Sequence, residues 1–410
     1  MRHGSQRACM KQPLETSDPG DGGALPGRKD RSMQDLTGGS SRRVEEIDIV
    51  KAIAIMLMVA CHAGVSFARF NQMFHMAIFF IAAGFFFRDS SSDSLCSTAK
   101  TIWSKYRKLV ILFFIWNTVF VLLHNPLTRT NIIPAGAENV AIPTPDPSSF
   151  YTAADIVKRI LLGLLFGYRE FLIGGFWFFR VLFLITAAYC AIDFLLKKLT
   201  KGNRWAGLGG QFIASATLLF VGWHFSRKGQ DFFSIPHVCS FYCLYFLGHL
   251  LALARSKYIN WKWPIYLAIL ILSFGLLLYL NTRGYVGYNL NDYYPGPLYM
   301  LCCAFTGWCW LYSMAWFLQK IPVVSTVLKV TGQKTLSVLI LHLPVLKVIQ
   351  IIQALYFKTP LYGLASFPSV RSGNTWWCLL YVALATAIPV LLDVLYRRLT
   401  SPIFKKGEGR

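Results

Sequence analysis

The sequence predicts an all-α fold, a polytopic membrane bundle of about ten transmembrane helices with both termini in the cytoplasm. Of the 410 residues, 55% are hydrophobic and only 15% are charged, and the mean hydropathy is +0.46. Soluble globular chains rarely contain so much apolar sequence. Apolar runs of roughly 20 residues, the length that crosses a bilayer as a helix, recur along the chain. The loops between these runs are short and rich in Lys and Arg, which is typical of a multi-pass membrane protein.

The chain divides into three predicted parts. Residues 1–44 are rich in Gly, Ser, Asp, Arg and Pro and have no apolar core of the kind found in a signal peptide. We therefore expect a disordered cytoplasmic tail there. Residues 45–398 form the transmembrane domain, and 399–410 form a cytoplasmic C-terminal tail.

Ten apolar runs account for the predicted spans. Each is bounded by charged, Pro-rich or Asn-rich sequence that suits a loop. The runs lie at 47–66, 73–88, 107–124, 174–195, 206–224, 237–254, 264–281, 296–318, 334–353 and 375–396. Between the third and fourth runs, a polar segment (125–150) precedes an amphipathic piece (151–168), which we expect to lie in the membrane interface or to re-enter the bilayer.

The distribution of charge sets the predicted topology. With the amino terminus inside, the basic clusters all fall on the cytoplasmic side. These clusters lie at 100–108, 197–204, 255–262, 320–334 and 397–406. The formal net charge of +22 is thus explained by positive loops, and we expect the lipid bilayer as a partner and no nucleic acid. The ten cysteines include no paired CxxC, so the sequence predicts neither a disulfide framework nor a metal site.

The first span contains three ionisable residues on nearly one face. A helix turns by about 100° per residue, so the eleven steps from Lys51 to His62 return to almost the same face, and Asp48 lies close to it. His62 is expected roughly 16 Å beyond Lys51, near the middle of the bilayer. Buried ionisable groups are costly, so we favour a hydrated, functional cavity lined by this face of the helix. The alternative is that Asp48 and Lys51 are anchors at the membrane interface and that His62 bonds to a neighbouring backbone carbonyl. With an unperturbed pKa of about 6.5, His62 is suited to proton transfer.

The second span combines a histidine with small residues. Gly84, next to Ala82 and Ala83, is expected to allow the close approach of another helix. His75 lies at the outer end of this span. Its two interpretations, an interface residue or a contact of the substrate, are equally supported by the residues alone.

Basic residues mark the entrances of two further spans. Arg107 and Lys108 open the third span, where they either bind phosphates or signal topology. Trp177 and Arg180 open the fourth span from the outer side. Arg180 is costly there unless it is paired, for which Glu170 is available, or hydrated.

The ninth span and an outer loop supply the remaining candidates. His342 is a second intramembrane imidazole, either an interhelical hydrogen-bonding group or part of a site. The aromatic loop Tyr293–Gly296 either stacks on a sugar or anchors at the interface.

The order of these motifs resembles the membrane acyltransferase family three, and within it the fucose and polysaccharide O-acetylases. The resemblance covers roughly residues 44–398. Its elements are Asp-x-x-Lys, ten residues between Lys51 and His62, and the strings FHMAIFFIAAGFFF, YRKL, FWFFR and GQKTLSVLILH. The resemblance implies a bundle of about ten spans that moves an acyl group, usually acetyl from cytoplasmic acetyl-CoA, to a hydroxyl of a glycan or lipid-linked sugar outside the cell membrane.

The resemblance also implies roles for individual residues. His62 would be the catalytic base or the nucleophile, with Asp48 and His342 as further catalytic residues. Lys51, Arg107 and Lys108 would hold the phosphates of acetyl-CoA, although the family more often has Arg at the first and third of these positions. Apart from the resemblance, we predict that His75, Trp177 and Arg180 contact the substrate. The family's Ser-Gly in the second span is Ala83-Gly84 here, so no hydroxyl role carries over.

A transporter or flippase for a glycolipid is the competing class, because it also needs wet charged sites inside the membrane. The sequence shows no internal repeats and no pair of half-length spans broken by Gly or Pro, which argues against this class. Consumption of acetyl-CoA by membranes containing the protein would separate the two hypotheses.

Overall fold

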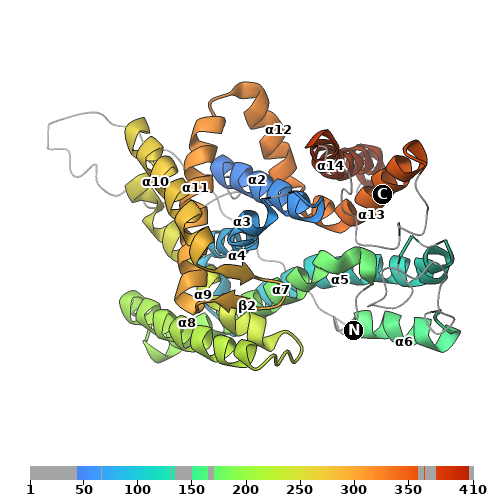
Figure 1. Ribbon diagram of the computed structural model, residues 1–410. Helices are drawn as coiled ribbons and strands as arrows, with labels where there is room; N and C mark the ends of the chain where they lie inside the picture. Colours follow the sequence, from blue (N-terminus) through green and yellow to red (C-terminus); the bar gives the residue numbers. More distant parts are fainter. Residues whose placement is uncertain are drawn as a thin grey trace, which may run out of the picture. The chain divides into compact units, whose positions relative to one another are not determined.

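The computed structural model describes residues 44–65, 67–130, 132–133, 150–164, 170–358, 364 and 375–405. These residues belong to one compact unit, Val44–Arg410 (Figure 1). The predicted tail at 1–44 lies outside the described residues except for Val44, as does most of the polar segment 125–150. At the other end, the chain is helical as far as Lys405.

The described residues are almost entirely helical. A helix overlaps each of the ten predicted apolar runs, and the all-α membrane bundle is therefore confirmed. The helices are α2 (Glu45–His62), α3 (Ala68–Gln72), α4 (His75–Phe85), α5 (Leu95–Arg129), α6 (Ala153–Gly163), α7 (Trp177–Leu199), α8 (Arg204–Arg227), α9 (Ile235–Tyr258), α10 (Trp263–Arg283), α11 (Pro297–Leu318), α12 (Pro322–Gln333), α13 (Thr335–Tyr356) and α14 (Thr375–Lys405), with the 3-10 helices η1 (Asp89–Ser92) and η3 (Phe171–Phe176).

Among the described residues, eight helices are long and apolar enough to cross a membrane: α5, α7, α8, α9, α10, α11, α13 and α14. The first two predicted spans differ from these. Helix α2 has 18 residues, but its first turn carries Glu45, Glu46 and Asp48. Helix α4 has only 11 residues, which extend about 16 Å, half the hydrocarbon thickness. It is shorter than the predicted 73–88 because residues 73–74 connect it to α3 and residues 86–88 connect it to η1.

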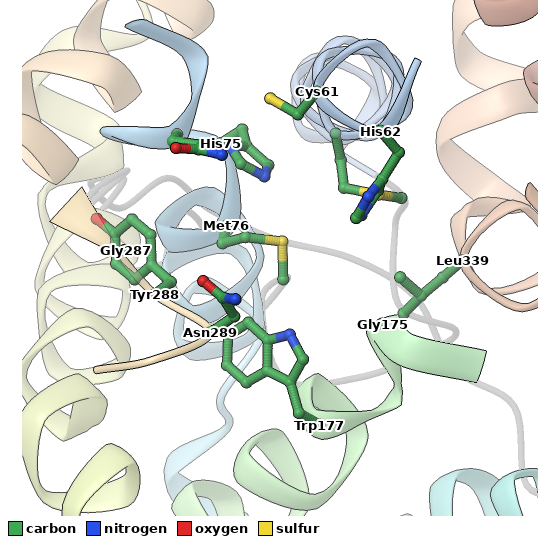
Figure 2. A pocket seen from close by; sticks show the side chains of 12 residues that line it. Cys61, His62, His75, Met76, Gly175, Trp177, Gly287, Tyr288, Asn289 and Leu339 are labelled. Carbon is green, nitrogen blue, oxygen red and sulfur yellow. The ribbon is translucent and has the colours of Figure 1, made fainter. Parts of the chain in front are cut away.

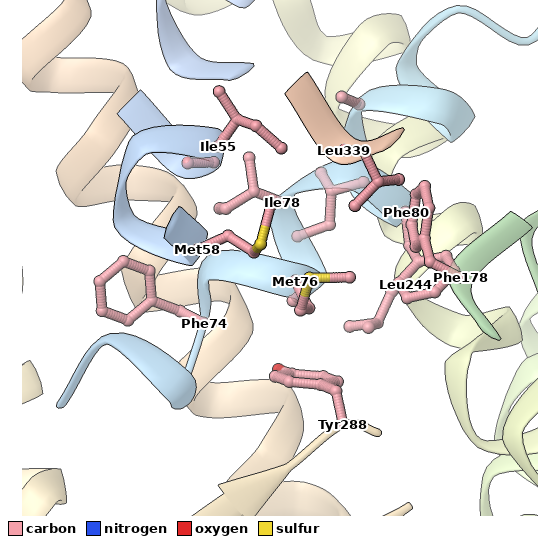
Figure 3. Close-up of a cluster of buried hydrophobic side chains, with 14 of the residues drawn as sticks. Ile55, Met58, Phe74, Met76, Ile78, Phe80, Phe178, Leu244, Tyr288 and Leu339 are labelled. Carbon is pink, nitrogen blue, oxygen red and sulfur yellow. The ribbon is translucent and has the colours of Figure 1, made fainter. Parts of the chain in front are cut away.

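Helices α2 and α4 form the centre of the packing. Helix α2 packs against α4, α11, α12 and α14, and α4 packs along α9. Their apolar side chains meet in a cluster that includes Ile55, Phe74, Ile78, Phe80 and Leu244, all of which are buried (Figure 3). The two most central helices are thus enclosed by other helices.

Glycines set the distance between α4 and α9. A Cβ atom at Gly84 would lie 1.8 Å from the backbone oxygen of Tyr245, and one at Gly248 would lie 1.9 Å from that of Ile81. No side chain fits in either place. The predicted close approach at Gly84 is confirmed, and α9 supplies the matching glycine.

Ion pairs gather at the end of the bundle where α2 begins. Glu45 pairs with Lys329 of α12 at 2.6 Å, and Glu46 pairs with Arg255, near the end of α9, at 3.5 Å. The start of α2 and the end of α9 therefore lie at the same end of the bundle. This agrees with the predicted alternation of the spans.

A β-hairpin joins α10 to α11. Strands β1 (Tyr285–Gly287) and β2 (Asp292–Tyr294) are antiparallel, with Val286 opposite Tyr293. In the sequence, Tyr293 is expected to be part of an aromatic loop. In the structure it lies in β2, is buried, and its phenol oxygen lies 3.0 Å from the hydroxyl of Ser240 on α9.

Candidate functional site

A cavity of about 240 Å³ lies where α2 ends. Its walls come from α2, α3, α4, the η3–α7 junction, the hairpin and α13 (Figure 2). The lining residues are Met58, Cys61, His62, Gln72, His75, Met76, Gly175, Trp177, Gly287, Tyr288, Asn289 and Leu339. Segments distant in sequence thus form one site.

The local sequence of α2 places His62 in this cavity. Met58, Cys61 and His62 are spaced by three and four residues, so they share one face of the helix. The helix then ends, because Gly64 adopts a positive φ of 77°, which favours glycine. His62 therefore occupies the last turn of α2, with its side chain in the cavity wall (Figure 2).

The two predicted imidazoles lie next to each other. The ring centroids of His62 and His342 are 5.1 Å apart, and the ring planes are inclined by 38°. His342 is the eighth of the 22 residues of α13, so it lies about 10 Å from the start of that helix. The sequence predicted each histidine singly, and the structure shows that they form a pair.

His342 has a defined hydrogen-bonding arrangement. Its Nδ1 lies 3.0 Å from the carbonyl oxygen of Val338 and 2.9 Å from that of Leu339. Because both neighbours are acceptors, Nδ1 carries the hydrogen and Nε2 has a free lone pair. This Nε2 is buried and has no hydrogen-bond partner among the described residues. Buried polar atoms are nearly always paired, so such an atom beside a cavity is a candidate contact for a ligand.

His75 lies in the wall formed by the start of α4. Its Nδ1 donates to the backbone oxygen of Asn71 at 2.7 Å, which fixes the ring against α3. Nε2 is then the nitrogen that can accept a hydrogen bond. His75 borders the same cavity as His62, and its contact with a substrate stays a prediction.

Asp48 and Lys51 lie at the opposite end of α2 from the cavity. The Lys51 ammonium is 2.8 Å from the Asp48 carboxylate, and 21% of the Lys51 side chain is exposed. Gln333 donates to the same carboxylate at 3.5 Å. Gly332 allows this contact, since a Cβ there would lie 1.8 Å from the backbone oxygen of Asp48. Asp48 thus holds Lys51 in place and does not border the described cavity.

The other predicted basic residues are separated from the cavity lining. Arg107 and Lys108 are exposed on α5, which packs against α6, α7 and η1. Trp177 lines the cavity, whereas Arg180, one turn later, donates to the Ser234 hydroxyl at 2.5 Å. The alternative partner considered for Arg180, Glu170, lies 3.1 Å from Nδ1 of His124.

Sequence reasoning missed the hairpin side of the cavity. Tyr288 and Asn289 line the cavity from the turn between β1 and β2. The available signal was the Asn-Leu-Asn-Asp sequence at 289–292, which lies between two segments rich in tyrosine, 285–288 and 293–294. This pattern is typical of a short hairpin.

A family model described as an acyltransferase domain matches residues 44–394. The chain belongs to the acyltransferase 3 family. The match includes every residue that lines the cavity, and together with the apolar helices it makes the protein an integral, multi-pass membrane acyltransferase. No curated protein and no solved structure matched the chain.

Proposed function

We propose that this acyltransferase moves an acetyl group from cytoplasmic acetyl-CoA to a hydroxyl of a cell-envelope or exported glycan, in the plasma or inner membrane. The observation that carries the proposal is the pair His62 and His342, 5.1 Å apart, beside a cavity in an acyltransferase-family chain. Imidazole can both accept and return a proton near neutral pH. Two adjacent imidazoles, of which His342 is buried and His62 is partly exposed, are therefore suited to transfer between a thioester and an alcohol.

His62 would act in one of two ways. As a general base, it takes the proton of the acceptor hydroxyl while the hydroxyl oxygen bonds to the thioester carbon. The carbon–sulfur bond breaks, and the imidazolium returns the proton to the sulfur. As a nucleophile, His62 bonds to the acetyl carbon as the carbon–sulfur bond breaks, and the other ring N–H passes its proton to the departing sulfur. The hydroxyl oxygen of the acceptor then takes the acetyl group, and the hydroxyl proton goes back to the His62 ring. In the first route the lone pair of His342 would stabilise the protonated His62, and in the second it would stabilise the positively charged acylated ring.

The acyl donor would enter from the end of the bundle where α2 begins. Coenzyme A is polyanionic, so its phosphates belong at a basic, hydrated entrance. We assign them to Lys51, Arg107 and Lys108, which are partly or fully exposed. The pantetheine arm is long and only mildly polar, so it can extend along α2 over the roughly 16 Å from Lys51 to His62.

Lys51→Ala is expected to raise the KM for acetyl-CoA by about tenfold, because one charge-assisted contact to a phosphate is worth about 1.4 kcal/mol or more. Lys51→Arg keeps the charge and should retain most of the affinity. Steady-state kinetics of CoA release in proteoliposomes measure both. Lys262→Ala, an exposed lysine before α10, is the matched control. Equal activity of the Arg and Ala variants at Lys51 would exclude the phosphate role.

The function itself is tested by the acetyl content of cell-surface glycans. Mass analysis of glycans from cells with and without the protein is expected to show loss of acetyl mass units in its absence. Purified protein should also consume acetyl-CoA, whereas a transporter or flippase would not. Unchanged glycan masses together with no consumption of acetyl-CoA would overturn the proposal.

A further inference from the structure

The cavity has a buried floor and an open mouth. His75, Met76 and Tyr288 are buried, whereas Gln72 and Asn289 are exposed. Figure 2 shows the side chain of Asn289 between Trp177 and Met76, across the cavity from His62. The mouth therefore lies at the α3 and hairpin side, where α2 ends, and away from Lys51 at the start of α2.

The polar groups at the mouth are available to a ligand. Within the part of the chain that the structure describes, the side-chain amides of Gln72 and Asn289 and the indole N–H of Trp177 make no hydrogen bond. Each amide offers both a donor and an acceptor, and the indole offers a donor. Converging polar groups in an otherwise apolar cavity are the usual way in which a site fixes the orientation of its ligand.

The hairpin that carries Asn289 is held in place by its backbone and neighbours. The Nε2 atom of His237 lies 3.2 Å from the backbone oxygen of Asn289. The Tyr288 hydroxyl donates to the backbone oxygen of Met73 at 3.1 Å. Burial raises the pKa of the Tyr288 phenol well above its ordinary value, so the hydroxyl keeps its proton. Arg69 donates to the backbone oxygen of Gly284 at 3.3 Å. The backbone that carries Asn289 is thus fixed before any ligand binds, which lowers the entropic cost of binding.

The chemistry of the lining limits the ligand. None of the described lining residues is Asp, Glu, Lys or Arg. Placing a charged group in such a cavity without a partner is costly. An indole ring beside planar amides suits a sugar. The apolar face of the sugar can lie on the indole ring while the sugar hydroxyls bond to the amides.

We propose that Asn289, Gln72 and Trp177 form the acceptor subsite, and that it takes an uncharged sugar residue and rejects uronic acids. The inference rests on the proposed function and deepens it by naming the charge class of the acceptor. The acceptor then enters through the mouth at the hairpin, and the acyl donor enters from the other end of α2.

The test compares matched pairs of soluble acceptors. Proteoliposomes are supplied with radiolabelled acetyl-CoA and one acceptor at a time. One pair of acceptors is octyl glucoside and octyl glucuronide, and the other is octyl galactoside and octyl galacturonide, each below the concentration at which it forms micelles. At least one neutral glycoside should be acetylated about tenfold faster than its uronide. This ratio is expected when the carboxylate of the uronide lacks one compensating contact with the cavity lining. Release of CoA is recorded in the same samples and in His62→Ala.

The outcomes separate the two proposals. If CoA release depends on His62 but uronides are acetylated as fast as neutral glycosides, or no neutral glycoside is acetylated, the subsite inference fails and the proposed function stands. If no His62-dependent CoA release occurs, both fail.

Variants locate the subsite. Asn289→Ala should raise the KM for the neutral glycoside about tenfold, the effect of losing one hydrogen bond, with the KM for acetyl-CoA unchanged. Gln72→Ala should act in the same direction. Leu290→Ala, the exposed neighbour of Asn289 at the hairpin tip, should leave both constants unchanged. An equal effect of Leu290→Ala and Asn289→Ala would assign the change to the hairpin as a whole and overturn the role of the amide.

Discussion

His62→Ala is expected to lower the rate of acetyl transfer by about a thousandfold, within the range that removal of a catalytic acid–base group produces. The expectation follows from the position of the ring, which borders the cavity and lies next to His342. The rate is measured as acetyl transfer by purified protein in proteoliposomes. His342→Ala should cause a smaller loss, because it removes a group that stabilises His62 and leaves the base itself in place.

Two controls make the His62 result specific. His224→Ala changes an exposed histidine of α8 and should keep the wild-type rate. Size-exclusion chromatography of His62→Ala should show the same monodisperse protein as the wild type. A well-folded His62→Ala variant with full activity would remove this residue from the chemistry.

Gly84→Ala is expected to destabilise the bundle by about 3 kcal/mol, at the upper end of the usual cost of overpacking. The added methyl group would lie 1.8 Å from the backbone oxygen of Tyr245, and since the obstacle is backbone, α4 and α9 must separate. Thermal unfolding in detergent, followed by the fraction of protein that stays monodisperse, measures the effect. The midpoint should fall by several degrees.

The matched control for Gly84→Ala lies in α10. A Cβ at Gly275 would meet nothing within 4 Å, so Gly275→Ala should leave stability unchanged or raise it by up to about 1 kcal/mol through helix propensity. If the two variants unfold at the same temperature, the close packing of α4 on α9 does not contribute to stability as described.

The helices could be predicted from the sequence because each long apolar run must satisfy its backbone hydrogen bonds internally in the membrane. The extent of α4 could not, because hydropathy measures how apolar a run is and not whether it is surrounded by lipid or by other helices. Phe74 and Phe80 are as apolar as lipid-facing residues, yet both are buried in the bundle core.

The candidate site was predicted in part. His62 and His342 stood out because ionisable groups in apolar spans are expensive. Their contact depends on how α2 and α13 pack, and 280 residues separate them (342 − 62). Gln72 and Asn289 are ordinary loop residues in the sequence, so only the fold brings them to the cavity mouth.

The most direct test of the account is a cryo-electron microscopy structure of the protein in lipid nanodiscs with bound CoA. The account predicts that the thiol lies in the cavity beside His62, with the phosphates at the end of α2 that carries Lys51. A structure with CoA bound elsewhere, and no passage from the Lys51 end to the cavity, would contradict it.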